Sequence, residues 1–148
     1  TVDKPRASAA FKARGWPGLW PVMRKTLLLH GFAGGLYLIV ATLVGETVMR
    51  WLYAGKYDDV HTELLLWAMC YLLMMLTAPL ETAQYVLHRT DALFGNRLVA
   101  MAVGLSLAAL TIPSLGAKGA LVAWGAAWLA SGSMSVRQLY VSQREART

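Results

Sequence analysis

Charged residues are scarce in this sequence. They make up 15% of the 148 residues, and hydrophobic residues make up 57%. An ordinary soluble domain is about 25% charged and about 45–50% apolar. Because the composition departs from that balance in both directions, it indicates a membrane protein.

Four long stretches contain no Asp, Glu, Lys or Arg at all, and each is close to the roughly 17–25 residues that a membrane-spanning helix needs. The stretches are 26–45, 64–80, 98–117 and 119–136. Little sequence remains for a soluble domain. We therefore expect an all-α, polytopic membrane protein with four transmembrane helices in a bundle.

Cysteine and the usual catalytic motifs are also nearly absent. The single cysteine, Cys70, lies inside an apolar stretch and excludes an internal disulfide. The sequence has no GxSxG, HExxH, CxxC or phosphate-binding GxxxxGK[ST] motif. The three histidines are scattered, which argues against a metal site. We expect no enzyme, no cofactor and no bound metal.

The sequence divides into a basic start, four helices and a polar end. Residues 1–23 are basic and aromatic, and glycines and prolines interrupt any long helix there, so we expect a cytoplasmic loop lying on the membrane rather than a nucleic-acid-binding arm. Gly55 is expected to end the first helix, before a short polar loop. The expected helices cover about 24–53, 62–88, 92–112 and 118–140, and 141–148 form a polar cytoplasmic tail.

Basic residues lie at alternate ends of the apolar stretches. Of the 14 lysines and arginines, all but Arg50, Lys56 and Lys118 fall before the first apolar stretch, between the second and third, or after the fourth. Cytoplasmic loops carry the excess of Lys and Arg in membrane proteins, so both termini are expected in the cytoplasm. This distribution also argues against nucleic acid as the partner of the net charge of +6.

A polar stripe occupies the end of the second expected helix. Thr77, Glu81, Gln84 and His88 are spaced i, i+4, i+7 and i+11, which puts them on one helix face. We interpret the stripe as lining a cavity. Pro79 lies within it and is expected to kink the helix.

Glu81 is the candidate ion-coupling residue. It lies seven residues deeper than His88, or about 10 Å at about 1.5 Å per residue. A carboxyl that exchanges a proton or holds a sodium ion is what ion-driven transport needs, and ionisable groups inside membranes are normally functional. The alternatives are direct contact with substrate, a structural hydrogen bond, or an ion pair with Arg97 or with a helix outside this sequence.

A positive cluster follows the stripe. Arg89, Asn96 and Arg97, with His88, are candidate ligands for a phosphate or pyrophosphate head group. The alternative is that they only anchor a helix end on the cytoplasmic side.

Small residues recur at helix-packing spacing in two places. Gly31 and Gly35 form a GxxxG pair in the first helix. In the fourth helix every fourth residue is small: Gly119, Ala123, Ala127 and Ser131. Both patterns predict close approach of a neighbouring helix.

Three loop sequences resemble motifs of polysaccharide-biosynthesis flippases, which belong to the multidrug/oligosaccharidyl-lipid/polysaccharide exporter superfamily. They are LYAGKYDD at 52–59, LETAQYVLHRTDAL at 80–93 and TIPSLGAKGALVAW at 111–124. They occur in the family's order and spacing over roughly 24–140, the region similar to the C-terminal four-helix module. The chain departs from the family pattern where His88 replaces the usual glycine before Arg-Thr.

The resemblance implies transport of a polyprenyl-pyrophosphate-linked oligosaccharide across the bacterial inner membrane for cell-surface polysaccharide synthesis, coupled to an ion gradient. These transporters have about a dozen or more helices, so the chain would supply one wall of the substrate cavity. Its partners would be membrane lipid, the lipid-linked oligosaccharide, and the remaining helices of a longer chain or a partner subunit. Two alternatives stay open: a cation or drug antiporter of the same superfamily, and a non-transporting four-helix anchor or assembly subunit.

Overall fold

The computed structural model describes residues 3–53 and 60–145 of the protein, and every regular element in these ranges is an α-helix. The helices are α1 (Asp3–Arg14), α2 (Trp16–Leu52), α3 (His61–Val86), α4 (Thr90–Leu115) and α5 (Ala117–Glu145). Helices α2 to α5 occupy the four expected helical regions, so the all-α expectation is confirmed. The helix end expected at Gly55 and the loop after it fall largely outside the described residues.

The basic start of the chain is helical, so the expected loop over 1–23 is wrong. The chain turns between α1 and α2 at Gly15, whose φ of 62° is accessible to glycine without steric cost. Pro17 falls in the first turn of α2, where a missing N–H costs nothing. Pro21 lies inside α2. At Gly18, a Cβ would overlap the backbone carbonyl of Ala10, so this glycine lets α1 fold back against α2.

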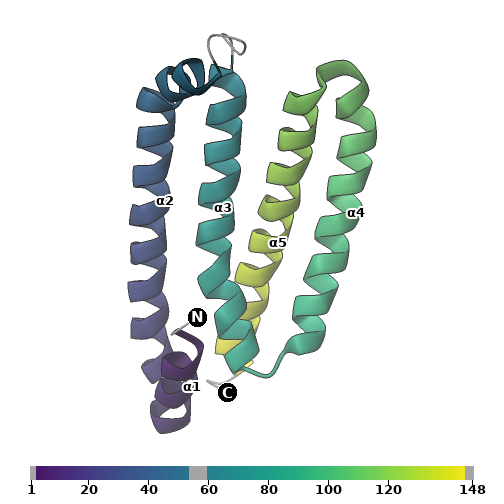
Figure 1. Ribbon diagram of the computed structural model, residues 1–148. Helices are drawn as coiled ribbons and strands as arrows, with labels where there is room; N and C mark the ends of the chain where they lie inside the picture. Colours follow the sequence, from purple (N-terminus) through teal and green to yellow (C-terminus); the bar gives the residue numbers. More distant parts are fainter. Residues whose placement is uncertain (1–2, 54–59, 146–148) are drawn as a thin grey trace.

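The four long helices of the expected bundle form an open row. Figure 1 shows them in the order α2, α3, α5, α4. Contacts join α2 to α3, α3 to α5, and α5 to α4, with a small contact between α3 and α4. One end of the row, by which we mean the helix termini on the side where α1 lies, also holds the α3–α4 connection and the end of α5 (Figure 1). The other end of the row, at the opposite helix termini, holds the α4–α5 turn at Gly116.

Small residues set the distance between neighbouring helices. The small-residue stripe of α5 faces α4, as predicted: a Cβ on Gly104 would lie 3.2 Å from that of Ala127, and one on Gly119 would overlap the backbone of Thr111. The GxxxG expectation for α2 is wrong in its second member. Gly34 packs against Leu72 of α3, whereas Gly35 has nothing within 4 Å of an added Cβ.

The outer surface of the row is apolar. Three helices in the described ranges, α2, α3 and α4, are long and apolar enough to cross a membrane. Large side chains such as Phe32, Leu43 and Trp51 (82% exposed) point outward. Water-soluble monomers rarely expose contiguous apolar surface of this extent, so the fold is that of a membrane protein. Helix α5 is long enough but less apolar, because Gly, Ala and Ser fill much of it.

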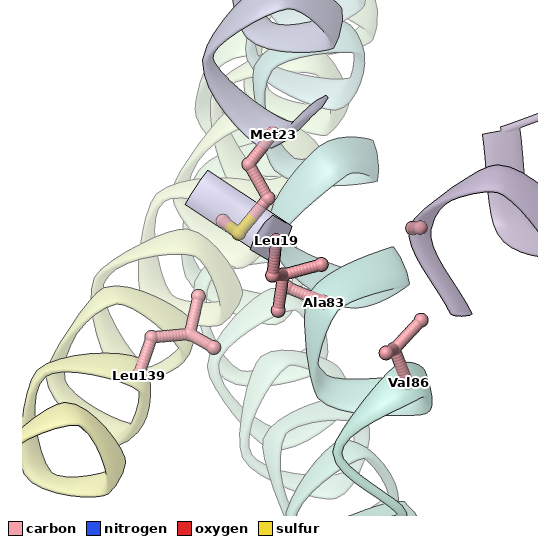
Figure 2. Packing of buried hydrophobic residues seen from close by; sticks show 6 residues of the cluster. Leu19, Met23, Ala83, Val86 and Leu139 are labelled. Carbon is pink, nitrogen blue, oxygen red and sulfur yellow. The ribbon is translucent and has the colours of Figure 1, made fainter. Parts of the chain in front are cut away.

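A compact apolar cluster joins the helices at the end of the row where α1 lies. It comprises Ala7, Leu19, Met23, Ala83, Val86 and Leu139. Figure 2 shows Leu19 of α2 beside Ala83 of α3, with Leu139 reaching in from α5. This cluster fixes the C-terminal part of α3, which contains Pro79, between α2 and α5.

His88 adopts a backbone conformation that favours glycine. It follows the end of α3 with φ at 54°, and the left-handed region costs a residue with a Cβ roughly 1–2 kcal/mol. We therefore expect His88→Gly to exceed His88→Ala in the free energy of unfolding by about 1 kcal/mol, measured in detergent.

Position 30, inside α2, supplies the matched control for His88. There the order reverses, because Gly in a helix interior is about 1 kcal/mol less favourable than Ala. If the Ala variant at position 88 were as stable as the Gly variant, or more stable, the left-handed conformation of His88 would be contradicted.

Candidate functional site

A buried network of amide side chains joins α3, α4 and α5. Gln84 of α3 and Asn96 of α4 are each 1% exposed. The Nε2 of Gln84 donates to the Oε1 of Gln138 on α5 at 2.8 Å, and the Nδ2 of Asn96 donates to the same oxygen at 3.0 Å. Gln138 returns a hydrogen bond from Nε2 to the Oδ1 of Asn96 at 2.9 Å. The three amide side chains thus provide one another with hydrogen-bond partners that the surrounding apolar residues cannot offer.

Ser135 adds a second attachment one turn away from Gln138 on α5. The Nδ2 of Asn96 donates to its hydroxyl at 3.2 Å, and the Nε2 of Gln84 donates to its backbone carbonyl at 3.4 Å. The Oε1 of Gln84 has no donor among the described residues. The network therefore holds one end of three helices together through directional bonds.

Glu81 and Arg97 form an ion pair between α3 and α4. The Nη2 of Arg97 lies 2.7 Å from Oε1 of Glu81 and donates to Oε2 at 2.9 Å. The Glu81 side chain is 24% exposed and that of Arg97 is 51% exposed. The guanidinium also lies over the ring of Trp128 on α5, 4.8 Å from its centroid, in the range of a cation–π contact.

The pair stands at one end of an open groove between α4 and α5. The groove has a volume of about 450 Å³, and Arg97 is the charged residue in its lining. Most of the lining is small or aromatic, from Ala100 and Gly104 on α4 to Trp124 and Ala127 on α5. A molecule with a long apolar part and an anionic end matches this lining.

The structure divides the predicted polar stripe between two neighbours. Thr77 and Gln84 face α5: the Cγ2 of Thr77 is 2.8 Å from a Cβ placed on Gly132. Glu81 faces α4 instead. His88 leaves the helix and is exposed. The stripe therefore does not form one cavity wall, because the helix face it occupies meets two helices.

The predicted anion cluster is also separated. Asn96 is buried in the amide network and is not at a surface where it would meet a head group. Arg89 immediately precedes α4, and Arg97 lies about two turns further along that helix. Of the predicted cluster, Arg97 is the cation that borders the groove.

Sequence reasoning missed Ser135 and Gln138 of α5, which complete the network. With Ser131 and Ser142 they are spaced i, i+4, i+7 and i+11, the same spacing as the predicted stripe of α3, and all three serines are buried. The spacing alone would have indicated a second polar face.

Two other charged pairs of the described residues lie at the other end of the row. Glu46 contacts Arg50 at 3.0 Å on α2, and Lys118 contacts Glu63 at 3.6 Å between α5 and α3. In residues 3–53 and 60–145, no three His, Cys, Asp or Glu side chains are grouped as a metal site. Charges thus gather toward the two ends of the helices.

No family model, no curated protein and no solved structure matches this chain.

Proposed function

We propose that this chain is the membrane module of a transporter that moves a lipid-linked oligosaccharide across the bacterial inner membrane. The observation that supports it is the Glu81–Arg97 pair beside the apolar groove between α4 and α5. An ionisable pair among membrane helices is costly and is a functional-site hypothesis by default. The pyrophosphate linker and the sugar come from the resemblance of the loop sequences.

The pair offers a simple way to couple substrate and ion. A guanidinium has five N–H donors, and Glu81 occupies the Nη2 group of Arg97. A pyrophosphate that draws Arg97 toward the groove would release the carboxylate, which then takes up a proton or a sodium ion. Binding of anion and cation would therefore favour each other, since such coupling is reciprocal.

The proposed orientation places the α1 end of the row in the cytoplasm. That end carries most of the basic residues of the described chain, including Lys12, Arg24 and Arg144. Cytoplasmic segments carry this excess. Helix α5 would be the fourth span, with its polar face turned toward α3 and α4 rather than lipid. Both termini then lie on the cytoplasmic side.

One observation favours the alternative of a non-transporting anchor or assembly subunit. Glu81 already has a partner, and Asn96 and Gln138 satisfy each other. Paired polar groups of this kind also specify how helices dock. The test below separates the two functions.

The test is Glu81→Gln in the intact protein, reconstituted in vesicles with a lipid-linked oligosaccharide and an imposed proton or sodium gradient. We expect transport to fall by about tenfold or more, a loss equivalent to ~1.4 kcal/mol, with membrane levels unchanged. The amide retains the shape of the carboxyl but cannot exchange a proton.

Glu63→Gln is the matched control, because Glu63 pairs with Lys118 at the other end of the row. It should leave transport close to wild type. Normal transport by Glu81→Gln, with unchanged dependence on pH and sodium, would remove Glu81 from the mechanism and favour the anchor.

A further inference from the structure

A second cavity, separate from the groove beside Arg97, lies between α2, α3 and α5 near α1. Its volume is about 400 Å³, within the range of about 300–1,000 Å³ of pockets that hold small ligands. Its walls include Trp16 and Met23 of α2, Pro79 of α3, and Leu139 of α5. Figure 2 shows Met23 and Leu139 in the adjoining apolar cluster. The cavity is therefore apolar over most of its wall.

The rim of this cavity is cationic and aromatic. Arg24 lies in the lining and has no hydrogen-bond or ion-pair partner within the described ranges. Tyr140 also lies in the lining, and Arg144 donates to its hydroxyl at 3.0 Å with the guanidinium 4.8 Å from the ring centroid. Trp20 is 58% exposed at the same rim. Exposed aromatic side chains of this kind are typical of the head-group level of a membrane.

The cations near the cavity have few opposing charges. Among the side chains that the structure describes, no acidic one lines the cavity. Glu81, the nearest acid along α3, is paired with Arg97 on the side facing α4. An anionic ligand would therefore supply a charge that the described residues do not.

We propose that this cavity binds an anionic phospholipid of the surrounding membrane. One acyl chain occupies the apolar space between α2 and α5, and the phosphate lies at the rim between Arg24 and Arg144. Basic pockets between membrane helices on the cytoplasmic side bind such head groups. A lipid fits better than a further helix, because it brings both a negative charge for Arg24, which has no ion-pair partner in the described ranges, and a chain for the apolar space beside it.

The test measures retained lipid by native mass spectrometry of the intact protein, titrated with phosphatidylglycerol or phosphatidylcholine. We expect wild-type protein to prefer phosphatidylglycerol. Arg24→Gln should weaken its binding by about fivefold, the contribution of one basic residue near the membrane surface. Val136→Trp should abolish binding, because Val136 is exposed and lines the cavity, so an indole ring at this position would fill it.

Two matched variants control for charge and for bulk. Lys25→Gln removes a neighbouring exposed cation that does not line the cavity, and Val122→Trp adds the same ring elsewhere on α5. Both should bind phosphatidylglycerol as wild type does. The proposal is overturned if Lys25→Gln and Arg24→Gln lose affinity equally, if Val136→Trp still binds, or if the intact protein retains no lipid because another helix fills the cavity. The lipid site does not depend on the proposed transport function. A negative result in the lipid experiment would therefore leave the Glu81 test unaffected.

Discussion

Replacing Arg97 with glutamate should destabilise the protein by about 2–3 kcal/mol and abolish transport. The substitution turns the contact between Arg97 and Glu81, 2.7 Å in the structure, into a repulsion between two carboxylates. Breaking a fully buried pair typically costs about 3–5 kcal/mol. We expect a smaller loss because the Arg97 side chain is half exposed. Chemical unfolding in detergent gives the stability, and vesicle assays give the transport rate.

The double variant Glu81→Arg/Arg97→Glu separates folding from function. It restores opposite charges between α3 and α4, so most of the stability should return. Transport should not return, because the guanidinium then leaves Trp128 and the groove. Arg50→Glu is the control for charge reversal at an exposed pair, Arg50–Glu46 on α2, whose expected cost is below about 1 kcal/mol. Full transport by the double variant would show that the position of the guanidinium does not matter.

Asn96→Leu should cost about 2–3 kcal/mol of unfolding free energy. The substitution removes the acceptor of the Gln138 Nε2 and the donor to the Ser135 hydroxyl. Leaving a buried polar group without its partner costs about 1–3 kcal/mol, and hydrogen bonds between membrane helices are worth about 0.6–2 kcal/mol each. Chemical or thermal unfolding in detergent is the measurement.

Ser106→Leu on α4 provides the control for Asn96→Leu. Ser106 is exposed and has no side-chain partner in the described ranges, so its replacement should change stability by less than about 0.5 kcal/mol. The double variant Asn96→Leu/Gln138→Leu should not recover the loss, because it also removes the acceptor of the Gln84 Nε2. Equal stability of Asn96→Leu and wild type would show that the network contributes little to holding α4 on α5.

Apolar stretches were sufficient to locate the four long helices, because 17 or more residues without charge fit few other structures. Local signals failed at the first 23 residues. Pro17 and Gly18 are helix breakers in isolation, yet Pro17 falls in a first turn and Gly18 lies where α1 crosses α2. That compatibility depends on a tertiary contact, which local sequence does not contain. The open row, too, depends on which helix faces meet.

The candidate site was predictable in part for the same reason. Spacing placed Glu81 and Gln84 on one side of α3, and the ion pair with Arg97 was among the interpretations left open. Spacing did not reveal that this side meets two helices, nor that Gln138 bonds to both Gln84 and Asn96. These partners are about 40–55 residues apart, so their pairing follows from how α5 docks.

The order of contacts along the row has a consequence for biogenesis. Helices α2 and α3 form one hairpin of sequence neighbours, and α4 and α5 form another. The two hairpins join where α5 meets α3, with the amide bonds at one end of that contact. Helix α5 is the least apolar of the four. During synthesis it would therefore stay packed against α4 until its serines and glutamine form their contacts with α3. Docking of the hairpins, rather than insertion of single helices, would then complete the polar interior.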